Sequence, residues 1–361
     1  MIGSGRVPVV LVSGVDVDAM ASAVVALQWD LPRAVSVHHE VDPEREVLRR
    51  VVSDVTGIVE SLEIDVAHAC VSCAIREDVV PTLERLAADG RWDAIVARLP
   101  VTAEAAQVCR VIGWAPENVP HVEVAASVVA LAADDLLGDL LGDDLVHERD
   151  LPVRDDDDRG VAEVACAMVE YADVVAVADR LDDDERRFLS ALARPGVPVV
   201  ESFSEVDAAR LAAGVHHHRR TEAWVAPVRR YELPEVDPAG AWVLEVESDR
   251  PFHPDRLRDA IATLGGGPRR SRGCFWLPSR PDQILVWDGA GGQLSVGSTD
   301  TWGSGTPLTR ITVVGLDDGR DELDHAFRSC LLTDAEMAER GPFWEITEDG
   351  FEPWLGPTPR A

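Results

Sequence analysis

The chain has 361 residues, 46% of them hydrophobic, which is enough for two domains with buried cores. Its formal net charge is −31, from 65 acidic and 34 basic residues, and every basic residue is arginine. An acidic surface repels phosphate backbones, so the composition argues against broad nucleic-acid binding. No segment approaches the roughly 20 apolar residues that cross a bilayer. No secretory signal follows the first apolar run, so the chain is predicted to be cytoplasmic.

Short apolar strands alternate with helical segments through the first two hundred residues. Strands are predicted at 7–12, 34–38, 93–97, 120–125, 173–178 and 197–200. A helix is predicted over 76–88, because Val79, Leu83 and Leu86 follow one another at spacings of four and three. This alternation is typical of βαβ units, so residues 1–202 are predicted to form an α/β domain with a mostly parallel sheet.

An acidic segment at 134–160 interrupts the alternation. We interpret it as an exposed, solvated excursion. A cation-binding loop is the alternative, although the segment lacks the glycine and terminal glutamate of a calcium loop. After it, the periodic pattern weakens over 203–240 and several prolines occur, so this stretch is predicted to be a linker.

A second domain is predicted over 241–361. It opens with an alternating strand at 241–247, and a helix then begins at Pro254 and ends at three consecutive glycines. Further strands are predicted at 274–277, 283–288, 293–297 and 310–316, followed by a helix at 321–332. This order predicts a small α+β domain.

The turn after the first strand is where a P-loop nucleotide-binding protein carries Gly-x-x-x-x-Gly-Lys-Thr. Gly14 is present, but the second glycine, the lysine and the first hydroxyl are replaced by Ala19, Met20 and Ala21. Methionine supplies no charge for a phosphate and alanine cannot hold Mg²⁺. We therefore assign no cofactor-binding residue and do not expect GTP to bind this degenerate phosphate loop.

Several segments together resemble the CobW-like family of P-loop GTPases and metallochaperones. Residues 68–78 read His-Ala-Cys-Val-Ser-Cys-Ala-Ile-Arg-Glu-Asp, and residues 170–175 read Glu-Tyr-Ala-Asp-Val-Val. In the C-terminal part, 275–282 reads Phe-Trp-Leu-Pro-Ser-Arg-Pro-Asp, with further similarity at 252–257 and 331–337. The resemblance covers nearly the whole chain. It implies a degenerate P-loop NTPase-like domain followed by a CobW C-terminal-like domain.

Other nucleotide-binding elements of that family also differ here. The family's Glu-x-x-Gly segment corresponds to residues 98–101, where the glycine is Val101. Leu181 stands at the position where the family has the aspartate that reads guanine, unless a shift of register recruits Asp182. The resemblance therefore implies a pseudo-GTPase without catalytic residues, and we favour a protein that is not an enzyme.

The cysteine motif is better preserved. Cys70 and Cys73 match the outer cysteines of the family motif, and a serine replaces the middle one. Zinc prefers four ligands, or three and a water, from thiolates and imidazoles. His68 is a natural third ligand, and His38 or His39 could approach from a neighbouring segment. Zinc binding, two inherited structural thiols and a redox dithiol all remain open.

Two further features have simple interpretations. The run His216-His217-His218 is metal-like, but we interpret it as a solvated loop. Trp344 and Trp354, in a tail rich in proline and glycine, are candidates for an exposed partner anchor.

The form of the cysteine motif resembles a phosphate-loop-deficient actinobacterial subgroup, which includes a mycobacterial ribosome-hibernation recruitment factor. This resemblance implies a non-hydrolysing adaptor in zinc homeostasis or the zinc-starvation response. Its partner would be a protein, either the ribosome or a ribosome-associated hibernation factor, without sequence-specific nucleic-acid or membrane binding. The alternative is a zinc metallochaperone or zinc-binding sensor with residual GTP binding.

Overall fold

The computed structural model describes residues 5–66, 68, 70–149, 151–229, 241–346 and 348–358. The chain divides into two compact units. The first contains Met1–Asp139 and Asp144–Val225, and the second contains Leu140–Asp143 and Ala226–Ala361. Within the described residues, no helix is both long enough and apolar enough to cross a membrane.

The first unit is built on an eight-stranded sheet with the strand order β4-β3-β2-β5-β1-β6-β7-β8. Its strands are β1 (Val7–Ser13), β2 (Ala34–Asp42), β3 (Val47–Asp54), β4 (Gly57–Asp65), β5 (Ala94–Arg98), β6 (Val122–Leu131), β7 (Val174–Val177) and β8 (Val199–Val200). The six strands from β2 to β8 in this order run parallel, and β3 pairs antiparallel with both β2 and β4. The predicted α/β class with a mostly parallel sheet is confirmed.

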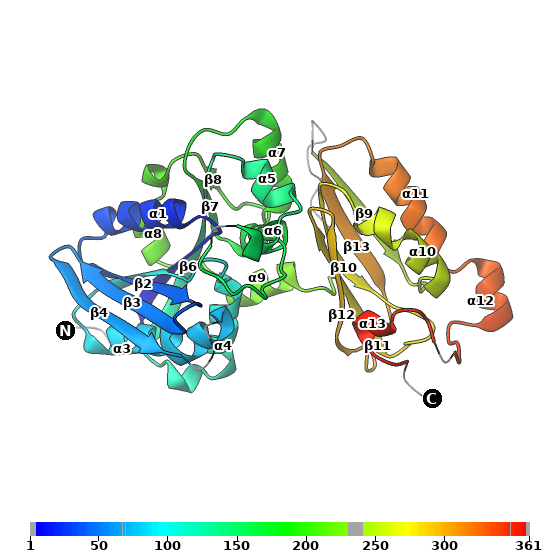
Figure 1. Ribbon diagram of the computed structural model, residues 1–361, viewed down its shortest axis with the longest axis horizontal. Helices are drawn as coiled ribbons and strands as arrows, with labels where there is room; N and C mark the ends of the chain where they lie inside the picture. The colour runs from blue at the N-terminus through cyan, green and yellow to red at the C-terminus, as the bar shows by residue number, and fades with distance from the viewer. Residues whose placement is uncertain are drawn as a thin grey trace. The chain divides into compact units, whose positions relative to one another are not determined.

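Helices cover both faces of this sheet (Figure 1). The helices are α1 (Val17–Asp30), α2 (Val71–Ala74), the π-helix η1 (Ile75–Val79), α3 (Val80–Asp89), α4 (Ala105–Trp114), α5 (Leu136–Leu141), α6 (Val161–Tyr171), α7 (Asp183–Leu192), α8 (Ala208–Ala212) and α9 (His218–Val225). Successive strand residues point to opposite faces. Val10 of β1 shares a buried cluster with Met20 of α1, and Leu11 shares another with Leu83 of α3. Both faces of the sheet are therefore apolar.

Two local expectations for the first unit need revision. The hairpin of β3 and β4 extends the sheet beyond the predicted strand at 34–38. Its outer strand β4 is mostly exposed, so it lacks the alternating apolar pattern that identifies a strand. Residues 203–225 of the predicted linker form short helices within the first unit. Residues 230–240 of that linker lie outside the described residues.

The second unit has a five-stranded antiparallel sheet with the order β12-β11-β10-β13-β9 (Figure 1). Its elements are β9 (Trp242–Ser248), α10 (Pro254–Gly265), β10 (Arg269–Phe275), β11 (Gln283–Ala290), β12 (Gln293–Thr301), β13 (Thr309–Gly315), α11 (Arg320–Cys330), α12 (Asp334–Arg340) and α13 (Glu352–Leu355). Leu257 of α10 and Phe327 of α11 share a buried cluster with Trp287 of β11. These helices therefore cover one face of the sheet, and the predicted α+β domain is confirmed.

The Phe-Trp-Leu-x-x-Arg-Pro-Asp segment contacts both the core of this unit and its C-terminal tail. Phe275 is part of the core under the helices, and Trp276 packs in a smaller cluster with Cys274 and Trp302. The fully buried Arg280 pairs with the buried Asp349, its Nε lying 2.8 Å from Oδ2. The guanidinium of Arg280 also donates to the carbonyl oxygen of Gly356 at 2.8 Å. The motif therefore joins the sheet to the C-terminal tail.

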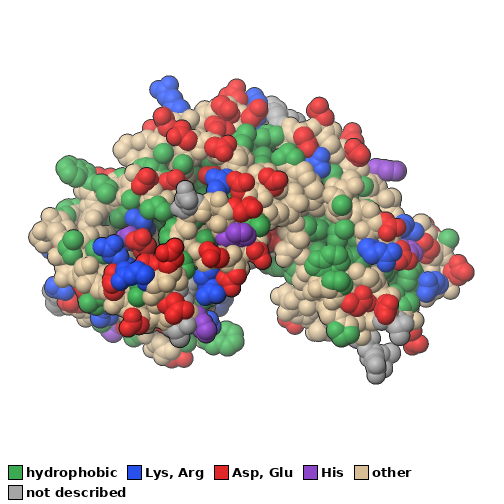
Figure 2. Space-filling model, viewed as in Figure 1, with side chains coloured by type: hydrophobic (Ala, Val, Ile, Leu, Met, Phe, Trp, Pro, Cys, Tyr) green, Lys and Arg blue, Asp and Glu red, His purple; other side chains and the backbone are tan. Residues whose placement is uncertain are grey.

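Acidic side chains are spread over the face of the molecule that Figure 2 shows. This distribution agrees with the net charge of −31. The exposed aromatic side chains include Trp29 on α1 and Trp114 at the end of α4, which are 84% and 91% exposed. Trp344 is buried and packs edge-on against His253 at a centroid distance of 5.1 Å. It is therefore not the exposed anchor that the sequence suggested, whereas Trp354 is about half exposed.

Candidate functional site

The turn between β1 and α1 occupies the position of the predicted phosphate loop. The turn is short, because α1 begins at Val17, three residues after Gly14. Ala19, Met20 and Ala21 therefore lie within the helix. Met20 is fully buried. A Cβ atom on Gly14 would lie 2.5 Å from a carbonyl oxygen of β6 and 2.9 Å from Met20 Cγ, so this glycine allows the turn to pack closely on the core.

Asp16 caps the start of α1. Its Oδ1 accepts a hydrogen bond from the Ala19 N–H at 2.6 Å, where a helix otherwise offers its free amides to an anion. Further acidic groups lie near this turn. Burial raises the pKa of the Asp139 carboxyl to about 6, Arg149 opposes the shift, and Asp135 and Asp16 add to it. The surroundings of the turn are therefore negative.

The residues aligned with the guanine-reading motif have structural roles. Leu181 is buried. Asp182 caps α7 and accepts hydrogen bonds from the N–H groups of Asp184 and Glu185, both at 2.9 Å. Val101, aligned with the family's glycine, is also buried.

The cysteine motif forms the short helix α2. Cys70 is the N-cap, and its Sγ accepts a hydrogen bond from the Cys73 N–H at 3.4 Å. A side-chain hydrogen bond with Cys70, burial and the nearby Glu77 raise the pKa of the Cys73 thiol. Both cysteines are half-buried, and His68 is exposed. Within the described residues, the donor atoms of His68, Cys70 and Cys73 are not gathered into a three-ligand cluster, and their metal binding stays a prediction.

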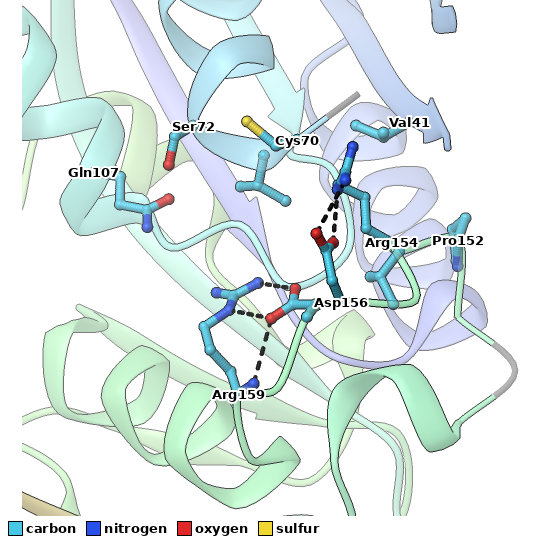
Figure 3. A pocket seen from close by; sticks show the side chains of 11 residues that line it. Val41, Cys70, Ser72, Gln107, Pro152, Arg154, Asp156 and Arg159 are labelled. Atoms are coloured by element: carbon cyan, nitrogen blue, oxygen red, sulfur yellow. Dashed lines mark hydrogen bonds and ion pairs between the residues drawn. The ribbon is translucent and has the colours of Figure 1, made fainter. Parts of the chain in front are cut away.

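Beside Cys70 lies a pocket of about 350 Å³ (Figure 3). Cys70 lines one side, and residues of the acidic segment line the other. Arg154 Nε lies 2.7 Å from Asp156 Oδ1, and Arg159 Nη2 lies 2.7 Å from Asp157 Oδ2. Part of the predicted solvated excursion therefore folds back, pairs its carboxylates with its own arginines and forms a pocket wall.

The histidines of β2 differ in their contacts. The buried His39 places Nε2 2.8 Å from Asp78 Oδ1, and Arg50 Nη1 lies 2.5 Å from Asp78 Oδ2. Arg50 also donates to the Thr82 hydroxyl at 2.9 Å. His39 therefore belongs to a buried structural network. Burial lowers the pKa of the neighbouring His38 to about 4, and Arg98 contributes to this shift.

The structure brings together a cluster of donors that the sequence did not predict as a unit. One donor atom each from Cys109, His216 and His218 lies within 4.8 Å of the others. Cys109 Sγ is 3.8 Å from His216 Nε2. The other ring nitrogen of His216, Nδ1, lies 2.8 Å from Asp173 Oδ2, and His218 Nδ1 lies 3.2 Å from the Tyr171 hydroxyl.

Asp173 positions His216 in this cluster and is itself held by two hydrogen bonds. Its carboxylate accepts hydrogen bonds from Arg194 Nη2 at 2.6 Å and from the Ser127 N–H at 2.9 Å. Burial lowers the pKa of His216, but hydrogen bonds to Asp173 and Cys109 outweigh it and raise the pKa to about 9. Burial likewise raises the pKa of the Cys109 thiol, but hydrogen bonds to His216 and to His218 bring it below its usual value. The cluster therefore favours a thiolate.

Sequence reasoning identified the histidine run but not its surroundings. Cys109 lies on α4, Asp173 precedes β7, and the histidines precede or begin α9. The N–H of His216 donates to the carbonyl oxygen of Ala125 in β6 at 2.8 Å, which fixes the segment beside the sheet. These elements are distant in sequence, so only the histidine run could have pointed to the cluster. By composition alone, that run is interpreted as a solvated loop.

The C-terminal unit matches a known domain family. Residues 242–331, from β9 to α11, match the family model for the cobalamin synthesis protein cobW C-terminal domain. The second unit therefore contains a region similar to the cobW C-terminal domain, and a mostly parallel α/β unit precedes it in the chain.

Two relatives and one solved structure match most of the chain. The zinc chaperone Rv0106 of Mycobacterium tuberculosis is 28% identical, over 97% of this chain and 94% of its own length. The zinc-regulated GTPase metalloprotein activator 1 of Dictyostelium discoideum is 21% identical, over 79% of this chain and 69% of its own length. The Zn(II)-bound YjiA GTPase from E. coli is 15% identical with a TM-score of 0.36, over 90% of this chain and 99% of that chain.

Proposed function

We propose that this chain is a CobW-like protein that acts in zinc homeostasis or the zinc-starvation response without binding or hydrolysing GTP. The β1–α1 turn carries the proposal. The carboxylate of Asp16 occupies the start of the helix, where a bound phosphate would accept from the same amides. The side chain aligned with the P-loop lysine, Met20, is buried in the core.

The energetic argument follows from these two positions. A carboxylate about 4 Å from a phosphate charge costs up to roughly 4 kcal/mol at an effective dielectric constant of 20. Micromolar affinity corresponds to only about 8 kcal/mol in total. With no lysine to offset the repulsion, the turn does not retain a triphosphate.

The zinc part of the proposal rests on the relatives and on the donor groups. The two relatives described above carry zinc in their names. This chain keeps the free thiols of Cys70, which lines a pocket, and of Cys73, and His68 is exposed nearby. Zinc accepts these donor types.

We further propose that the chain works in the cytoplasm as a protein-binding adaptor, with the ribosome or a ribosome-associated hibernation factor as its partner. The nearly fully exposed indoles of Trp29 and Trp114 support a protein-binding surface, because tryptophans are enriched among residues that dominate binding energy. Trp114 and the half-exposed Trp354 lie in different units.

Isothermal titration calorimetry with Mg-GTP and Mg-GDP tests the absence of nucleotide binding. We expect no saturable heat from the reduced protein, and a P-loop GTPase titrated under the same conditions is the control. Micromolar binding would overturn the pseudo-GTPase proposal and favour the second candidate, a zinc metallochaperone or sensor with residual GTP binding.

Co-sedimentation with ribosomes from zinc-starved cells tests the partner. We expect the chain to pellet with ribosomes, either alone or with added hibernation factor. We expect the Trp114→Ala variant to pellet less than the wild type, and Glu222→Gln, which changes a nearby partly exposed side chain, to behave like the wild type. If wild-type protein stays in the supernatant in both mixtures, the ribosomal adaptor role is wrong.

A further inference from the structure

We propose that Cys109, His216 and His218 form a transition-metal site, and that zinc is the ion that fits it best. This site is distinct from the Cys70 and Cys73 motif, and the inference does not depend on the nucleotide argument above. The three residues bring one thiol and two imidazoles together from α4 and from the start of α9.

The separation of the donor atoms suits a tetrahedral ion. With zinc bonds of about 2.3 Å to sulfur and about 2.05 Å to nitrogen, tetrahedral angles place sulfur and nitrogen roughly 3.6 Å apart. Cys109 Sγ and His216 Nε2 are 3.8 Å apart. All three donor atoms lie within 4.8 Å of one another. Side-chain movements of about 1 Å would therefore bring them to the separations of a tetrahedral site.

Each of the two imidazoles has a hydrogen-bonding partner at Nδ1. His216 Nδ1 contacts Asp173, and His218 Nδ1 contacts the Tyr171 hydroxyl. Metal-bound histidines almost always donate their second N–H to a carboxylate or another acceptor, which fixes the tautomer and the ring orientation. Asp173 is itself held by Arg194 and by the Ser127 amide. His216 Nε2 faces Cys109, so its Nδ1 contact with Asp173 is the outer hydrogen bond typical of a metal-bound histidine.

The composition of the cluster indicates an exchangeable site. Three protein ligands leave one tetrahedral position for water or another donor, whereas closed structural zinc sites use four protein ligands. His218 is partly exposed at the start of α9, while Cys109 and the His216 ring are buried. The ion would therefore enter from the His218 side.

The same residues have a second chemical interpretation. Cys109, His216 and Asp173 also follow the order of a cysteine nucleophile, its base and an orienting carboxylate. The second imidazole and the burial of the thiol favour the metal, because a nucleophile must reach its substrate. The experiment below separates these interpretations.

Cobalt(II) titration of the reduced, metal-free chain tests the site, because a thiolate ligand gives a charge-transfer band and tetrahedral coordination gives intense visible bands. We expect both bands in the wild type and in the Cys70→Ser/Cys73→Ser control. We expect the band to disappear when Cys109→Ser is added to that control, where Cys70 and Cys73 no longer supply a thiolate. The proposal is wrong if cobalt gives no such band in the Cys70→Ser/Cys73→Ser control, or if the band persists when Cys109→Ser is added to it. Absence of the band together with rapid alkylation of Cys109 would indicate the nucleophile instead.

A second pair of variants guards against misfolding. His218→Asn should weaken cobalt binding about tenfold or more, and the adjacent exposed His217→Asn should bind like the wild type. Circular dichroism of each variant reports folding independently. Equal affinity of folded His218→Asn and His217→Asn would remove His218 from the site and overturn the three-ligand proposal. No nucleotide is present, so this outcome is independent of the GTP test.

Discussion

Replacing Asp139 by asparagine should stabilise the first unit at neutral pH. The Asp139 side chain is 13% exposed. The pKa of its carboxyl is about 6 in the folded chain and about 3.9 in an unfolded one. At about 1.4 kcal/mol per pKa unit, the charged form costs the fold roughly 3 kcal/mol. The substitution also removes the 3.2 Å contact to Arg149, but Arg149 keeps Asp144 as a partner at 2.6 Å.

The pH dependence has a definite sign. Between about pH 4 and pH 6 the folded chain binds more protons at Asp139 than the unfolded chain, so this group lowers stability as the pH rises. The advantage of Asp139→Asn should therefore grow by about 1.4 kcal/mol per pH unit over this window, reach up to about 3 kcal/mol and stay constant above it.

Guanidinium denaturation of both chains between pH 4 and pH 8 measures this difference. Asp144→Asn is the matched control, because it touches the same arginine but is 51% exposed. The control should change stability by less than about 1 kcal/mol at every pH. The reasoning is refuted if Asp139→Asn is less stable than the wild type at pH 7.5, or if its advantage does not depend on pH.

Three further outcomes are expected. Met20→Lys should not restore GTP binding in calorimetry. It should lower the free energy of unfolding by about 3 kcal/mol or more, because the side chain at this position is fully buried. Measurable GTP affinity would contradict this expectation. Asp78→Ala should cost about 3–5 kcal/mol in denaturation experiments, because it leaves the buried Arg50 without that carboxylate; a loss under about 1 kcal/mol would show that the network is not structural. Trp114→Ala should leave the melting temperature unchanged, because the indole is 91% exposed, and a large decrease would show that it packs in solution.

The fold class could be predicted from the sequence because the buried strands are continuous apolar runs. The runs that became β1, β5 and β7 are apolar on both faces, as buried parallel strands require. Strand β4 was missed because it is an exposed edge whose residues need no apolar pattern. The helical character of 203–225 was obscured by the short lengths of α8 and α9.

The site was less accessible to sequence reasoning. The loss of the P-loop lysine is visible in the sequence, but the cap that Asp16 provides depends on where α1 begins. His39 was a plausible zinc ligand by residue type. Its hydrogen bond with Asp78 could not be predicted, because it depends on how β2 and η1 lie against each other in the fold. Cys109 and His216 meet across 107 positions of sequence, and no local pattern reports such a distance.

The clamp around Arg280 makes the tail beyond β13 and α11 an integral part of the second unit. Its guanidinium is fully enclosed, and both its counter-charge, Asp349, and its carbonyl acceptors come from residues 349–357. Deleting this stretch would remove the counter-charge and the carbonyl acceptors of Arg280, so shortened versions of the chain should misfold. A tag or fusion is better attached at the opposite terminus.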